Sequence, residues 1–444
     1  MSFEAGTYRI EELIAAGLME IGDGYRAKNS ELSDHGIPFA RAGNINDGFN
    51  FDSADLFPAA ALSRVGNKVS RPGDVVFTSK GTVGRFALVS DETQQFVYSP
   101  QLCFWRSLAP NKLLPEYIYY WMKSAEFYDQ VGYLKGQTDM ADYVSLRDQR
   151  RITATFPETQ SQRSIVGVVR PLDDRITLLR ETNATLEAIA QALFKSWFVD
   201  FDPVRAKEEG RAPEGMDEAT AALFPDGFEE SELGLVPRGW RVATLGEVVQ
   251  AAGGGTPDTK DTSYWEPAEH CWTTPKDLSG IQAPVLLGTE RKLSAKGIAK
   301  ISSGLLPVGT LLMSSRAPIG YLAMTNVPMA INQGYIAMLP NSVLPPIYML
   351  FWCRQNMETI KSHANGSTFM EISKKAFRPL AALVPSIALL AEFVTVANAL
   401  FARIVENEVQ AQTLSTLRDT LLPRLISGQL RLPAAETLLE EFAA

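Results

Sequence analysis

Two segments of the sequence place one basic side chain in a polar loop after an apolar, strand-like run. Lys80 lies in DVVFTSKGTVGRFALV, residues 74–89, and Arg316 lies in LLMSSRAPIGYLAM, residues 311–324. A guanidinium can donate two hydrogen bonds to guanine O6 and N7, which discriminates against other bases by roughly 1–3 kcal/mol, and an ammonium makes a weaker version of this contact. Either side chain could instead neutralise a phosphate, because at least half of all protein–DNA hydrogen bonds go to the sugar–phosphate backbone.

Other polar side chains near these loops extend the set of candidates. Glutamine can pair with adenine N6 and N7, so Gln101, Gln137 and Gln333 could contact bases. Hydroxyl and ammonium groups commonly bind phosphates. The candidates for phosphate contacts are Thr82, Thr138, Ser315, Thr368, Lys374 and Lys375. For the two adjacent lysines, a solvated surface without a ligand is the alternative.

Two short turns after apolar residues could also contact DNA. The segment ARAGNI contains Arg41 and Asn44, and the segment WTTPKDL contains Thr274 and Lys276. These residue types are also common in turns for structural reasons, because their side chains bond to the nearby backbone. Ordinary turn chemistry is therefore the alternative at all four positions.

The two basic loops belong to a repeat that extends along most of the chain. The separation between matching residues falls gradually, from 236 residues (84 to 320) to 228 residues (157 to 385), as differences in loop length would produce. The matches are Gly84 with Gly320, Gln101 with Gln333, Tyr117 and Trp121 with Tyr348 and Trp352, GQTDM with GSTFM, and Pro157 with Pro385. This pattern indicates the tandem duplication of a whole domain. Within it, Arg316 replaces Lys80, and Ser367 replaces Gln137 as a further candidate for DNA contact.

Length, composition and charge are compatible with two globular units. The chain has 444 residues, of which 45% are hydrophobic, which is enough for two cores. The net charge of −9 is concentrated in residues 206–238, which hold nine acids and three bases, and in the three acids after Arg431. Two nearly neutral domains can still present basic faces to phosphates.

Several protein classes are disfavoured by what the sequence contains. The three cysteines and three histidines do not form a disulfide pattern or a zinc-ligand pattern. The N-terminus does not resemble a signal peptide, and no run of eighteen apolar residues occurs. We therefore expect a cytoplasmic, soluble protein without a membrane segment. Walker-type loops, glycine-rich cofactor loops and an amino-methyltransferase tetrapeptide are missing as well, so we expect no catalytic residues.

Each copy of the repeat divides into an α+β globule and a long helix. Short apolar runs such as DVVFT, QLCFW and YIAML predict strands joined by irregular loops. Residues 161–199 and 389–427 predict helices with an apolar seam at alternating three- and four-residue steps, including Asn183 and Asn407. Two such seams favour pairing with each other, whereas packing of each helix on its own globule is the alternative. Pro171 and Pro423 count against unbroken helices.

Four motifs resemble the specificity subunit of type I restriction-modification enzymes, and the resemblance covers nearly the whole chain. They are LFKSWFVDFDPV (193–204), LFPDGFEESELGLVPRGW (223–240), GGTPDTKDTSYW continuing to WTTPKDL (254–278), and LLPRLISGQL (421–430). The resemblance implies an α+β fold with two tandemly repeated target-recognition domains. Each domain is followed by a long helix, and the two helices pair as an antiparallel coiled-coil spacer.

The expected organisation has six parts. They are target-recognition domain 1 (1–155), spacer helix 1 (156–205), an acidic linker (206–238), target-recognition domain 2 (239–384), spacer helix 2 (385–431) and an acidic tail (432–444).

The resemblance also implies double-stranded DNA, two methyltransferase subunits and two restriction subunits as partners. S-adenosylmethionine, ATP and Mg²⁺ would be bound by those partners and not by this chain. Because the two basic loops differ, we expect two different half-sites. An orphan DNA-binding or methyltransferase-sequestering protein without restriction is the alternative.

Docking of partner subunits is expected at the helices and their ends. The candidates are Arg175, Trp197, Phe198, Phe201, Arg403 and Arg424. The aromatic members of this set could instead be buried where the helix pair meets a domain.

Overall fold

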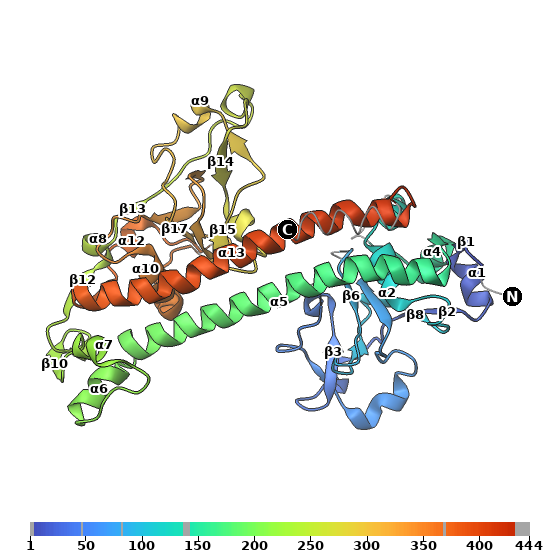
Figure 1. Ribbon diagram of the computed structural model, residues 1–444, viewed down its shortest axis with the longest axis horizontal. Helices are drawn as coiled ribbons and strands as arrows, with labels where there is room; N and C mark the ends of the chain where they lie inside the picture. Colours follow the sequence, from blue (N-terminus) through green and yellow to red (C-terminus); the bar gives the residue numbers. More distant parts are fainter. Residues whose placement is uncertain (1–3, 46–47, 81–82, 136–142, 367–369, 431–444) are drawn as a thin grey trace. The chain divides into compact units, whose positions relative to one another are not determined.

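A computed structural model describes residues 4–45, 48–80, 83–135, 143–366 and 370–430 (Figure 1). The chain forms two compact units. Unit 1 comprises residues 1–174 and 414–444, and unit 2 comprises residues 175–413. Each unit contains one globule together with a stretch of each of the two long helices.

The globule of unit 1 is built around a four-stranded antiparallel sheet of order β2-β8-β5-β6. A three-stranded sheet of order β4-β3-β7 and the pair β1-β9 complete it. The strands are β1 (Gly6–Arg9), β2 (Met19–Asp23), β3 (Ile37–Ala40), β4 (Leu56–Phe57), β5 (Asp74–Thr78), β6 (Phe86–Leu88), β7 (Val97–Tyr98), β8 (Leu102–Ser107) and β9 (Thr153–Phe156). The helices are α1 (Ile10–Ala15), α2 (Pro115–Met122), α3 (Ala125–Lys135) and α4 (Leu146–Arg151).

Strand β5 is buried on both faces, which explains its apolar sequence. Its side chains alternate between two cores, so Val75 and Phe77 pack with α2, whereas Val76 packs with Phe104 on the other face. A strand that is covered on both faces does not need the polar residues that a half-exposed strand alternates with.

The globule of unit 2 repeats this arrangement. Its main sheet has the order β13-β20-β17-β18-β15, a second sheet has the order β16-β14-β19, and β12-β21 and β10-β11 form two-stranded pairs. The strands are β10 (Phe228–Ser231), β11 (Gly234–Pro237), β12 (Arg241–Thr244), β13 (Ala251–Ala252), β14 (His270–Thr273), β15 (Val285–Leu286), β16 (Lys292–Leu293), β17 (Leu311–Ser314), β18 (Leu322–Thr325), β19 (Met329–Ile331), β20 (Tyr335–Met338) and β21 (Ala381–Val384). The helices are α6 (Asp202–Glu208), α7 (Glu218–Ala222), α8 (Leu245–Val248), α9 (Ala295–Ile298), α10 (Pro346–Gln355), α11 (Met357–Ser362) and α12 (Lys374–Phe377).

Equivalent strand pairings confirm the predicted duplication. The antiparallel pair β5-β8 corresponds to β17-β20, and the parallel pair β3-β7 corresponds to β14-β19. The pairing also corrects one match. Thr78 pairs with Leu102 and Ser314 pairs with Tyr335, so the separation at β8 and β20 is 233 residues (102 to 335). Gln101 is therefore equivalent to Gly334, and its predicted match with Gln333 is wrong by one residue.

The two long helices α5 (Thr159–Phe198) and α13 (Ile387–Ile426) are confirmed, and each has 40 residues. Neither Pro171 nor Pro423 ends its helix. An interior proline removes one backbone donor and favours a kink, but it does not have to end the helix.

Contacts within each unit show that the helices pair in antiparallel directions. In unit 2, Asn407 Nδ2 donates to Asn183 Oδ1 at 2.9 Å, and the ring of Phe198 lies 5.1 Å from that of Phe393. Residue numbers therefore rise along one helix as they fall along the other. In unit 1, Arg418 and Asp173 form an interhelical ion pair of 2.6 Å. The seam prediction is confirmed at most of its positions.

Helix α13 is long and apolar enough, by length and composition alone, to cross a membrane. Burial in this fold explains part of its apolar character, since 28% of its most apolar stretch is buried. Phe393 and Ala397 are buried in the core of unit 2, and Leu421 and Leu425 are buried in the core of unit 1. The helix is a core element of both units.

Candidate nucleic-acid interface

The β5-β6 loop and the β17-β18 loop have the same backbone hydrogen bonds. The N–H of Gly84 donates to Thr78 at 3.3 Å, and that of Gly320 donates to Ser314 at 3.0 Å. Both glycines have a positive φ, 105° and 106°. An L-residue with a side chain rarely adopts this conformation, so the turn requires glycine in both copies.

A second strand fixes the start of each loop. In unit 2, the Ser315 N–H donates to Gly334 O at 2.8 Å, and Ser315 O accepts from the Ile372 N–H at 3.0 Å. Ser79 has the same two kinds of bond in unit 1. Ser315 is only 3% exposed. Its burial does not fit the predicted phosphate contact, because a ligand at the surface cannot reach its hydroxyl.

The next residue in each loop is the predicted basic side chain, and it leaves this rigid backbone toward solvent. Lys80 is exposed and its backbone bridges to Tyr143, whereas Arg316 bridges to Glu371. The Arg316 side chain is 37% exposed, and its Nη1 lies 3.7 Å from Glu371 Oε2. A side chain that is anchored on rigid elements and directed to solvent is well suited to contact a ligand.

The two predicted turns have structural roles. The Arg41 N–H donates to Asn44 Oδ1 at 2.8 Å, and the Thr274 N–H donates to Asp277 Oδ2 at 2.7 Å. Each turn is thus closed by a side chain three residues later. Asn44 also donates to Asn50 O, and Arg41 forms an ion pair of 2.5 Å with Asp55.

Turn chemistry therefore accounts for Asn44 and Thr274, which were predicted to contact DNA. Lys276, which was also predicted to contact DNA, is exposed in the second turn.

The two glutamines support neighbouring loops. Gln101 Oε1 accepts from the Ala42 N–H at 3.1 Å, and Gln333 Oε1 accepts from Thr256 Oγ1 at 2.7 Å. An amide oxygen has two lone pairs, so each glutamine keeps acceptor capacity for a base. Their first role is nevertheless to hold a surface loop in place.

The glycine-rich run 253–255 brings Lys374 close to this region of unit 2. A Cβ at Gly254 would lie 1.8 Å from Ile331 O, and a Cβ at Gly253 would lie 2.7 Å from Lys374 Nζ. Close packing against the strand requires glycine at position 254, and the nearby ammonium of Lys374 favours glycine at position 253. The neighbouring Lys375 is exposed on α12.

The sequence interpretation missed two residues that follow the loop glycines. The Arg85 N–H donates to Thr78 Oγ1 at 3.1 Å, and the Tyr321 N–H donates to Ser314 Oγ at 2.8 Å, so the two residues are equivalent. Arg85 is exposed and its Nη1 donates to Ala42 O at 3.3 Å. Their position directly after a matched glycine is the signal that could have identified them.

Five predicted ligands lie outside the described residues. They are Thr82, Gln137, Thr138, Ser367 and Thr368. Within the described ranges, no group of three or more His, Cys, Asp or Glu side chains is placed to hold a metal ion.

The aromatic residues that were predicted to dock partners are core residues. Trp197 is 5% exposed and Phe198 is 6% exposed. Trp197 packs edge-on against Phe224 with ring centroids 5.2 Å apart, and Phe201 is partly buried against Trp240. The docking prediction is therefore wrong for Trp197 and Phe198, because these rings join the end of α5 to the globule of unit 2.

The basic residues that were predicted to dock partners are exposed on the helices. Arg175 and Arg424 lie at the surface, and Arg403 forms an ion pair with Glu406 at 3.0 Å. These three positions remain available for contacts with other chains.

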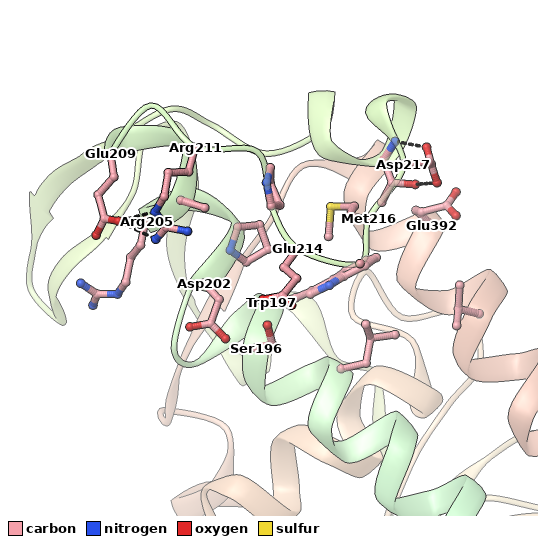
Figure 2. A pocket seen from close by; sticks show the side chains of 17 residues that line it. Ser196, Trp197, Asp202, Arg205, Glu209, Arg211, Glu214, Met216, Asp217 and Glu392 are labelled. Carbon is pink, nitrogen blue, oxygen red and sulfur yellow. Dashed lines mark hydrogen bonds and ion pairs between the residues drawn. The ribbon is translucent and has the colours of Figure 1, made fainter.

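Unit 2 also contains a cavity of about 700 Å³ beside the end of α5 (Figure 2). Figure 2 shows Glu209 joined to Arg211 at one end, and Asp217 and Glu392 at the other. Carboxylates outnumber guanidinium groups in its lining. Such a lining repels phosphate, so we exclude the cavity from the nucleic-acid interface.

The chain therefore carries two equivalent loops, one on each copy of a duplicated domain, and each loop presents one basic side chain. Residues 237–388 match the family described as "Type I restriction modification DNA specificity domain". The type I restriction enzyme HindI specificity subunit of Haemophilus influenzae is 26% identical over 429 residues, which cover 82% of this chain and 88% of that protein. The type I restriction enzyme MjaIX specificity subunit of Methanocaldococcus jannaschii is 34% identical over 142 residues, 32% of this chain and 33% of that protein.

Two solved structures are also similar. The S subunit of a type I restriction-modification system from M. genitalium has 16% identity and a TM-score of 0.49, with 96% of each chain covered. The HsdS subunit from Thermoanaerobacter tengcongensis has 18% identity and a TM-score of 0.34, with 96% of this chain and 97% of that chain covered. On the sequence matches, the chain is similar to type I restriction-modification specificity subunits along most of its length, and residues 237–388 match the DNA specificity domain of that family.

Proposed function

We propose that this chain is the DNA sequence-recognition subunit of a type I restriction-modification complex. Each globule recognises one half of a bipartite site, with Lys80 at one half and Arg316 at the other. The single observation that carries this proposal is the pair of loops with identical backbone bonding and different exposed side chains. A conserved backbone with a changed ligand-binding group is what recognition of two different half-sites requires.

The chain acts in this proposal without catalytic residues or cofactors of its own. Two methyltransferase subunits carry S-adenosylmethionine, and two restriction subunits carry ATP and Mg²⁺. The methyltransferase subunits dock on exposed faces of α5 and α13, where Arg175 and Arg403 lie. The complex works on cytoplasmic DNA.

Methylome sequencing of the host with and without the gene tests the proposal. A split, adenine-methylated motif should be present only with the gene. Arg316→Ala should then relax or weaken one half of the motif, and Lys80→Ala the other half. A substitution that alters both halves equally would contradict independent recognition by the two globules.

An orphan protein that binds DNA or sequesters methyltransferase is the second candidate. It is favoured by any host in which no restriction subunit associates with the chain. Coexpression with methyltransferase and restriction subunits followed by size-exclusion chromatography separates the two candidates, since a restriction-modification subunit must form a stable complex that contains both, whereas an orphan protein binds no restriction subunit. Charge reversal at Arg175 and Arg403 should weaken that complex, whereas the same change at Lys80 should not.

A further inference from the structure

The contact between Arg316 and Glu371 is longer than two arginine–carboxylate pairs in the globule of unit 1. Arg316 Nη1 and Glu371 Oε2 are 3.7 Å apart, with 37% and 46% of the side chains exposed. At this distance the pair attracts electrostatically but does not form a hydrogen bond. The donors of the guanidinium are therefore not used by Glu371.

Two pairs in unit 1 show the contrast. Arg106 donates to both oxygens of Asp74 at 2.6 and 2.8 Å and is 5% exposed, as expected for a structural ion pair. Arg41 lies 2.5 Å from Asp55. Both guanidinium groups are engaged by their carboxylates at hydrogen-bond distance. Arg316 is held near its partner while remaining free to bond elsewhere.

The backbone keeps Glu371 at this position. Its N–H donates to Asn365 O at 2.9 Å and its carbonyl accepts from the Asn365 N–H at 2.9 Å. On its other side it bridges to Arg316, next to the bond between Ile372 and Ser315. The carboxylate is thus carried by a backbone that is fixed on both sides.

The equivalent residue in unit 1 is Tyr143, which bridges to Lys80 in the same way. Tyr143 is 43% exposed, and its phenol is neutral at physiological pH because partial burial raises its pKa further above 10. Lys80 therefore has a neutral neighbour where Arg316 has an anionic one. The carboxylate is a feature of unit 2 and not of the shared fold.

We propose that Glu371 is a positioning residue that directs Arg316 to a guanine edge and disfavours contact with a phosphate; this rests on the proposed DNA-recognition function. A phosphate beside Arg316 would bring a second anion close to Glu371, and like charges repel. A guanine edge offers two neutral acceptors, O6 and N7, which can accept from two guanidinium donors of Arg316. The Glu371 carboxylate can stay beside the remaining side of the guanidinium. Glu371 therefore selects between the two roles that the sequence left open for Arg316.

The test uses the full-length chain, copurified with its methyltransferase subunits, on a randomised duplex library and on one non-specific duplex. With Glu371→Gln, affinity for the non-specific duplex should stay equal or rise, because one negative charge is removed. Discrimination at one base pair of the unit 2 half-site should fall about tenfold, and Glu371→Asp should restore part of it. The unit 1 half-site serves as an internal reference. Asp226→Asn is the matched control, since it breaks an exposed pair with Arg238 of 3.2 Å in the linker.

Failure of the role assigned to Glu371 can be distinguished from failure of the proposed DNA-recognition function. If Glu371→Gln lowers affinity for all sequences equally, or leaves the motif unchanged while Arg316→Ala relaxes it, Glu371 does not position Arg316 and the inference is overturned. If the unsubstituted complex selects no bipartite motif at all, the proposed function fails and the inference fails with it.

Discussion

Replacing one member of the buried Asn183–Asn407 pair should destabilise the helix pairing in unit 2 more than replacing both. The two side chains are 2% and 1% exposed and share a hydrogen bond of 2.9 Å. Asn407→Leu leaves the Asn183 oxygen buried without its donor, and an unsatisfied buried polar group costs about 1–3 kcal/mol. Replacing both residues by leucine removes both polar groups and adds apolar contact, so that variant should be equal to or more stable than the parent.

Urea unfolding of the full-length chain, followed by the helical circular dichroism signal, measures these differences. Gln410→Leu is the control, because it makes the same kind of change at an exposed position of α13 and should shift stability by no more than about 0.5 kcal/mol. The double-mutant cycle should give a coupling of at least about 1 kcal/mol. Additive effects of the two single substitutions would refute the reasoning, and so would an unchanged midpoint with Asn407→Leu alone.

Three further predictions concern single features of the fold. Burial raises the pKa of Glu408, and the nearby Arg180 lowers it in part. The folded state is therefore stabilised by protonated Glu408 at low pH, and this stabilisation is lost as the pH rises through the raised pKa. Glu408→Gln should flatten the dependence of unfolding free energy on pH and raise stability at neutral pH. Asp74→Asn should destabilise unit 1 by about 3–5 kcal/mol, seen as faster limited proteolysis, because it leaves a buried guanidinium without its bidentate partner. Duplicating residues 186–192 and 414–420 lengthens each helix by roughly 10 Å, and methylation sequencing should find unchanged half-sites with a spacer up to about three base pairs longer; an active complex with the original spacer would contradict this.

Much of the fold could be predicted because residues that match between the two copies adopt the same backbone conformation. Gly84 and Gly320 match in sequence and adopt the same positive φ, which only glycine accommodates easily. The match of Gln101 with Gln333 failed because side-chain identity does not fix backbone register, which depends on strand pairing. A one-residue slip is invisible when two glutamines happen to be near each other.

The candidate site was harder to predict because exposure depends on tertiary packing. Ser315 and Arg316 are neighbours in a polar loop, yet the first is buried and the second reaches solvent. Trp197 and Phe198 have the composition of a docking surface, but they are core residues because they pack on Phe393 of the partner helix and on the globule of unit 2. Sequence periodicity identifies the apolar seam of a helix but does not show which aromatic side chains outside the seam are buried by a globule.

The composition of unit 1 has a consequence for synthesis on the ribosome. Its core contains Leu421 and Leu425 from the last turns of α13, together with Ile165 and Leu172 from α5. All of unit 2, residues 175–413, is translated between these two contributions. At about 5–20 residues per second this interval lasts roughly 10–50 s, during which the emerging first domain has an uncovered apolar face. The domain that is made first is thus the last to be completed, and a nascent chain that stalls before Leu414 offers that face to chaperones and proteases.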